Sequence, residues 1–161
     1  MLHRAHTLVK EFIDGGYQHM SNIAGNRVFY TDSSCSTLVW CKENVVIEYY
    51  MIYPNVDIPL HWHPFNNQMI FIGGELTGRR VNPDTGIVST RLFSDVNVNM
   101  LVPVLPAYVK HGFSSGPLGA RLYNIQIWDQ TIANPVSAAI EYLGPRMGPL
   151  HAELISSVIP I

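Results

Sequence analysis

Hydrophobic residues follow a helical period at both ends of this chain. Near the N-terminus, apolar residues recur every three or four positions before Gly15 and Gly16, which predicts a short amphipathic helix over about residues 5–14. Near the C-terminus, Asn134 and Pro135 form a helix start and Gly144 forms a stop. A second helix is therefore expected over about 135–143.

Between the helices, β-branched and aromatic residues gather into short runs separated by turn residues, which is typical of strands. A further short strand is expected over 58–63, and the turn VNPDTG joins the fourth run to the fifth. This many short strands predicts an all-β sandwich or barrel between two helices. The runs are RVFYT, STLVW, NVVIEYYMIY, QMIFIGGELTG, GIVSTRLF, MLVPVL and ARLYNIQIW.

Length and charge narrow the class of protein. A chain of 161 residues that is 47% hydrophobic can bury one core, so we expect a single domain over 1–161, with the barrel over about 27–128. The net charge of -2 provides no basic surface for nucleic acid or an anionic membrane. Small molecules or proteins are the expected partners.

The N-terminus has no apolar run long enough for a signal peptide or a membrane span, so a cytoplasmic location is expected. Cys35 and Cys41 have no zinc-finger or redox spacing, and no disulfide is expected. The tail AELISSVIPI is largely apolar and must be covered, either by its own sheet or by a second copy of the chain. We favour a homodimer.

The stretch HWH carries the first candidate chemistry. Residues two apart in a strand share one face, so His61 and His63 project to the same side. Two imidazoles placed in this way can chelate a metal, and imidazole suits iron, nickel, copper and zinc. The alternative is a structural role, with both histidines hydrogen-bonded at a barrel mouth and His111 capping a turn.

The segment HWHPFNNQMIFIGGEL followed by VPVLPAYVKHGF resembles the two motifs of the cupin superfamily, over about residues 45–128. In that family a small barrel supplies His-x-His and an acid from one strand pair and a third histidine from a later strand. The resemblance implies a cupin-type β-barrel (jelly roll). It also implies one divalent metal ion (Fe, Mn, Ni or Zn) held by His61, His63 and His111.

Three positions depart from the family pattern. Tyr108 replaces a glycine, Ser115 replaces an asparagine, and the acid falls on either Asn67 or Gln68. Strand alternation allows only one of these two amides to face the barrel interior, and spacing does not choose between them. A neutral fourth group leaves the metal with its full charge of two, so an anionic ligand oxygen should bind readily.

Further candidates lie on the predicted strands. Glu48 and Tyr49 point to opposite faces, and whichever faces inward lines the pocket; with Gln68 they are the candidates for catalysis. Asn124, Gln126 and Trp128 share a face that either meets water outside or lines a polar cavity.

Arginines that could bind an anionic substrate follow the first motif. The alternative for each of them is a solvated position at the end of a strand. Arg79 is the candidate for binding an anionic substrate, with Arg80 and Arg91 nearby. The expected function is a metal-dependent enzyme, an isomerase, lyase, cyclase or oxygenase, acting on a small polar or anionic molecule. The alternative is a non-catalytic small-molecule-binding or assembly module with a degenerate metal site.

Overall fold

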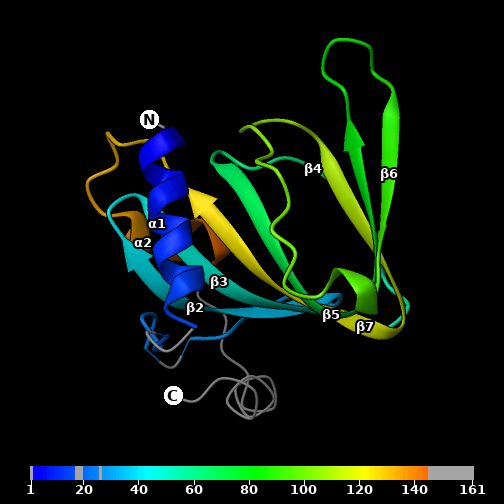
Figure 1. Cartoon of the computed structure of the whole chain (residues 1–161), viewed down its shortest axis with the longest axis horizontal. Coiled ribbons are helices and arrows are strands. Elements are labelled where there is room, and N and C mark those ends of the chain that lie inside the picture. The colour runs from blue at the N-terminus through cyan, green and yellow to red at the C-terminus, as the bar shows by residue number, and fades with distance from the viewer. Residues whose placement is uncertain (1, 17–19, 26, 145–161) are drawn as a thin grey trace.

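The computed structural model describes residues 2–16, 20–25 and 27–144. One 7-stranded antiparallel sheet forms the body, in the order β1-β2-β3-β7-β5-β6, and β4 pairs with β7 beside this path. Figure 1 shows the sheet curling into a barrel with α1 packed outside it. The elements are α1 (Leu2–Asp14), β1 (Phe29–Tyr30), β2 (Ser34–Lys42), β3 (Val45–Ile52), β4 (Asp57–His61), β5 (Asn66–Val81), β6 (Val88–Phe93), the 3-10 helix η1 (Asp95–Asn97), β7 (His111–Ile127) and α2 (Pro135–Leu143).

Two long strands, β5 and β7, contribute to both walls of the barrel. The first half of β7 lies between β4 and the second half of β5, which in turn pairs with β6. The second half of β7 lies between β3 and the first half of β5. The register between the two strands shifts around Gly74, whose φ is +93° and where a Cβ would lie 2.1 Å from the Gly119 carbonyl oxygen. Only glycine fits this bend.

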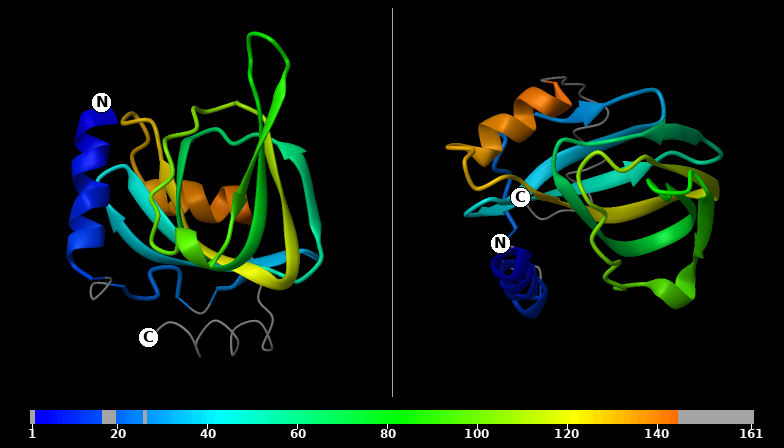
Figure 2. Two further views of the ribbon diagram at one scale, coloured as in Figure 1. Left: turned by 45° about the vertical axis from the view of Figure 1, so that its right-hand side comes forward. Right: turned by 90° about the horizontal axis from the view of Figure 1, so that it is seen from above.

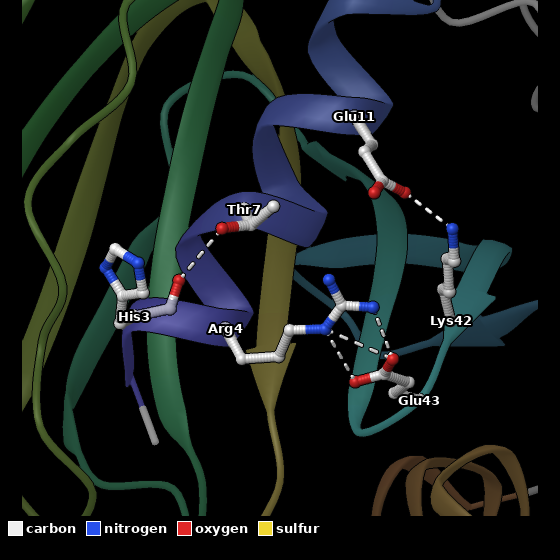
Figure 3. A network of polar contacts seen from close by, with 6 residues as sticks. All are labelled: His3, Arg4, Thr7, Glu11, Lys42 and Glu43. Atoms are coloured by element: carbon white, nitrogen blue, oxygen red, sulfur yellow. Dashed lines mark hydrogen bonds and ion pairs between the residues drawn. The ribbon is translucent and has the colours of Figure 1, made fainter.

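Helix α1 covers the outer face of the β3–β7 wall. Its apolar stripe, Ala5, Leu8, Val9 and Phe12, is buried against that wall. Two ion pairs hold its polar side to the β2–β3 turn: Arg4 to Glu43 and Glu11 to Lys42, each at 2.6 Å (Figure 3).

Helix α2 lies on the opposite side of the β2–β3 region from α1 (Figure 2). Its start matches the sequence signal, since the Asn134 side chain accepts a hydrogen bond from the Ser137 N–H at 3.0 Å and Pro135 follows directly. The helix packs on a buried cluster that includes Phe65 and Trp128.

The structure confirms the predicted fold class, an antiparallel β-barrel with one helix at each end. It also corrects three details. The run MLVPVL forms only isolated bridges at Leu101 and Leu105. The last strand begins at His111 and not near Ala120. The prediction began too late because three glycines, Gly112, Gly116 and Gly119, weaken the alternation over residues 111–119. Residue His63 lies beyond the end of β4.

Other expectations have mixed outcomes. Cys35 and Cys41 are both free thiols. None of the described helices has the length and apolar character needed to cross a membrane. The tail over 152–161, and the dimer contact expected from it, lie outside the described residues.

Candidate metal centre

Three histidines converge at one end of the barrel. His61 ends β4 and pairs across the sheet with His111, the first residue of β7, while His63 follows two residues after His61. Candidate ligand nitrogens of the three rings all lie within 4.8 Å of one another. The arrangement fits three nitrogen ligands around one small cation.

Each imidazole uses Nδ1 in a supporting contact. The Nδ1–H of His61 donates to the Pro59 carbonyl at 2.8 Å, and that of His111 donates to the Val109 carbonyl at 3.0 Å. Hydrogen bonds of this kind fix the tautomer and leave Nε2 as the ligand atom. The Nε2 of His111 is buried with no hydrogen-bond partner in the described part of the chain, which fits a metal ligand.

His63 is held by its surroundings although it lies outside a strand. Its ring stacks on Phe65 with centroids 4.8 Å apart, and its Nδ1 lies 2.7 Å from the Tyr142 hydroxyl of α2. Its carbonyl accepts a hydrogen bond from the Tyr108 N–H at 2.9 Å. Tyr108 has a φ of 65°, a left-handed conformation that glycine adopts without strain. Tyr108 therefore adopts a glycine-like backbone conformation at this turn.

The electrostatic setting favours neutral imidazoles. Burial, together with the charges of His111 and His61, lowers the pKa of His63 to about 3. Burial likewise lowers the pKa of His111 to about 4, against the raising effect of the Val109 hydrogen bond. Neutral rings are the form that binds a metal.

The strand register separates Asn67 from Gln68. Asn67 pairs with Gln126, on the face that carries Asn124 and Glu48, and it lines the cavity shared with His61 and His63. Its Nδ2 donates to the Asn124 side chain and, at 3.1 Å, to the Ile125 carbonyl. Gln68 pairs with Ile125 on the other face. Of the two amides, Asn67 is therefore the one that shares a cavity with His61 and His63.

A buried carboxylate faces the same cavity from another strand. Glu48 of β3 is 1% exposed; Asn124 Nδ2 donates to its Oε1, and Gln126 Nε2 does so more weakly at 3.4 Å. Its Oε2 is buried without a hydrogen-bond partner among the described residues. Burial raises the pKa of Glu48, against the lowering effect of Asn124, Ser36 and Gln126.

The cavity in front of these groups has a volume of about 330 Å³, enough for a small organic molecule. Its lining residues include His61, His63, Glu48 and Asn124. Tyr142 of α2 also lines it, and burial and the charge of Glu48 raise the pKa of its hydroxyl.

Several expected site residues lie elsewhere. Tyr49 is buried on the opposite face against Tyr123, in the cluster covered by α1. Gln126 and Trp128 are buried and bond each other at 3.0 Å, so of the last-strand candidates only Asn124 lines the cavity. Arg79 forms an ion pair with Asp57 at 2.9 Å.

Tyr142 is a site residue that sequence reasoning missed. It comes from a helix 79 residues after His63, and no local spacing connects the two positions. The predicted helix over residues 135–143 includes Tyr142 but does not predict its contact with His63. That contact follows from the way α2 packs on Phe65 and Trp128.

Comparison with profiles of protein families and with curated protein sequences found no match. Comparison with solved structures found oxalate decarboxylase from Bacillus subtilis, at 14% identity with a TM-score of 0.58, covering 88% of this chain and 40% of that one. That enzyme has Mn(II) centres. Hydroxypropylphosphonic acid epoxidase from S. wedmorenis matches at 12% identity and a TM-score of 0.51, covering 62% of this chain and 53% of that one.

At these identities the likeness shows the fold. The chain spans about half of the epoxidase chain, 53%, and 40% of the decarboxylase chain.

Proposed function

Because this chain has the cupin fold, we propose that it is a metal-dependent enzyme acting on a small polar or anionic molecule. The observation that carries the proposal is the convergence of His61, His63 and His111, each with Nδ1 in a supporting contact. The Nε2 atoms would hold one divalent metal ion, with Asn67 as a fourth or supporting group. Fe, Mn, Ni and Zn all suit imidazole nitrogen in some measure.

The ligand set defines what the metal would contribute. When bound, a divalent ion there would act as a Lewis acid that polarises a carbonyl or anionic oxygen of the substrate. Asn67 carries no charge, so the side chains of this set do not offset the charge of the ion. An anionic substrate would supply the negative charge that an acidic side chain at this position would have supplied.

Glu48 is the group proposed to hold or move a proton. Its Oε2 has no hydrogen-bond partner in the described part of the chain, and the residue lines the cavity together with His61 and His63. Asn124 holds the other oxygen, Oε1, and so fixes the carboxyl. Burial raises the pKa of this carboxyl and so favours its protonated form. A protonated carboxyl can donate a proton to a substrate oxygen and take one back.

Tyr142 closes and orients the site in this proposal. Its hydroxyl lies 2.7 Å from Nδ1 of His63, and its ring contacts Phe65 edge-on with centroids 5.4 Å apart. Together, α2 and Phe65 hold the His63 ring and screen that side of the cavity from water. A homodimer and a cytoplasmic location complete the proposal.

The test is metal loading of protein purified without a histidine tag. Reconstitution with Mn(II), Fe(II), Ni(II) or Zn(II) should give about one equivalent of bound metal. His61→Ala and His111→Ala should each abolish binding while the far-UV circular dichroism stays that of a folded barrel. His6→Ala, on the exposed side of α1, is the matched control and should load fully.

Two results contradict the proposal. Metal content that survives both alanine substitutions shows that the ligand set is wrong. Loading of wild-type protein below about a tenth of an equivalent rules out the enzyme in its metal form. The second result would instead favour a non-catalytic small-molecule-binding or assembly module with a degenerate site.

A further inference from the structure

The barrel wall that carries His111 also carries two arginines on the same face. Arg80 of β5 is the register partner of His111, and Arg91 of β6 is the partner of Gly78, which in turn pairs with Phe113. Partners in an antiparallel pair point to the same side and have Cα atoms about 5 Å apart. Arg80 and Arg91 therefore project from the wall on the side of His111.

Arg79 projects from the opposite face and has a structural role. Its Nη1 donates to Ser114 Oγ at 2.7 Å and its Nη2 to the Ile58 carbonyl at 3.0 Å, and Asp57 balances its charge. These contacts join β4, β5 and β7. Arg79 is also among the residues that line the cavity beside Arg80, so a role for it in substrate binding stays a prediction. The phase of β5 places Arg80, and not Arg79, on the side of His111.

A second cavity, of about 230 Å³, lies in front of Arg80 and Arg91; we call it the arginine cavity. His111 lines it, and Asn67, Met69 and Phe113 line both this cavity and the one that contains His61 and His63. The two cavities therefore adjoin at the histidine cluster. The Nε2 of His111 is buried and has no hydrogen-bond partner among the described residues.

Charge in the arginine cavity is unbalanced. The lining residues include no aspartate or glutamate in the described part of the chain, while Ser89, the register partner of Arg80, adds a hydroxyl group. Arg91 contacts the sulfur of Met100 at 3.3 Å and the ring of Phe93, neither of which offsets its charge. Arg80 has no ion pair with any described acidic residue. Two guanidinium groups with no carboxylate among the residues that line their cavity attract anions.

We propose that the arginine cavity binds a second acidic group of the substrate, so that the substrate is a small molecule with two carboxylates. One carboxylate lies toward His61, His63 and His111, and the other lies between Arg80 and Arg91. This inference rests on the proposed function for the first carboxylate, whereas the second depends on the arginines alone. The combined size of the two cavities fits a short dicarboxylate chain.

The experiment compares dicarboxylates with monocarboxylates of equal chain length by isothermal titration calorimetry. The pairs are malonate with propionate, succinate with butyrate, and glutarate with pentanoate, each titrated into zinc-loaded, tag-free protein. In the wild type, the best dicarboxylate should bind at least about tenfold more tightly than its partner. In Arg80→Gln/Arg91→Gln this advantage should vanish, with zinc content unchanged.

A charge-matched control separates local recognition from net charge. Arg4→Gln/Lys10→Gln also removes two positive charges, but from exposed positions on α1, and should keep the advantage of the dicarboxylate. The inference is overturned if the double arginine variant keeps the advantage with its zinc bound, or if wild-type protein shows none.

Metal-free protein distinguishes the two proposals. If the wild type fails to load zinc, the proposed function fails, and the same ligands are titrated into the metal-free protein. Weaker dicarboxylate binding in Arg80→Gln/Arg91→Gln than in wild type and in the α1 control then still supports the arginine cavity. Equal binding in all three proteins overturns it.

Discussion

The hydroxyl of Tyr142 lies 2.7 Å from Nδ1 of His63, and this contact links the C-terminal helix to the candidate metal centre. His63 is the one histidine of the three whose Nδ1 contacts a side chain rather than a backbone carbonyl among the described residues. The position of α2 therefore bears directly on the orientation of a metal ligand.

Tyr142→Phe keeps the ring packing on Phe65 and removes only the hydroxyl. Loss of such a supporting contact typically weakens metal affinity by about tenfold or more. We expect that loss in a competition titration against a chelator, with little change in the melting temperature. Tyr108→Phe removes a hydroxyl from an exposed tyrosine and should leave metal affinity unchanged. Unchanged affinity in Tyr142→Phe would show that the contact does not support the site.

The amide at the acid position gives a second prediction. Asn67→Glu places a carboxylate in the cavity with His61 and His63, and its charge should tighten metal binding more than about tenfold. Gln68→Glu adds the same charge on the opposite face of β5, beside Ile125, and should leave affinity within about threefold of wild type. Tighter binding in Gln68→Glu alone would show that the register of β5 at the site is wrong.

Glu48 predicts an unusual pH dependence of stability in the metal-free protein. In the unfolded chain its carboxyl ionises near the ordinary value of 4.5, whereas burial raises the pKa in the folded state. Between these two values the unfolded chain has released a proton that the folded protein keeps. The free energy of unfolding should therefore fall as pH rises above about 4.5, by at most about 1.4 kcal/mol per pH unit.

The substitution Glu48→Gln removes the ionisable group and with it this loss of stability at higher pH. The variant should be more stable than wild type at pH 7, and the difference should shrink as pH falls toward 4.5, in urea denaturation across that range. Glu43→Gln is the control, because Arg4 lowers the pKa of that exposed carboxyl and its removal should bring no gain with pH. A difference between Glu48→Gln and wild type that stays constant with pH would show that the pKa of Glu48 is not raised in the folded protein.

Local signals in the sequence were sufficient for part of this site. The spacing of His61 and His63, and the cap formed by Asn134 and Pro135, depend on neighbouring residues, so the motif and helix α2 could be predicted. The resemblance to the two motifs predicts that His61, His63 and His111 form one site, and the structure brings the three together.

The remaining features of the site depend on how strands that are far apart in the sequence pair with each other. Whether Asn67 or Gln68, and Arg79 or Arg80, faces the histidines is decided by the phase of β5 against β7. That phase is set by bulges near Gly73 and Gly74, which interrupt the simple alternation of a strand. The contact of Tyr142 with His63 depends on the packing of a helix and could not be derived from spacing.

Anomalous scattering from crystals of tag-free protein grown with zinc tests the central claim most directly. The claim predicts a single strong peak about 2 Å from Nε2 of His61, His63 and His111 together. Absence of a peak at that point, or a peak held by other residues, would contradict it.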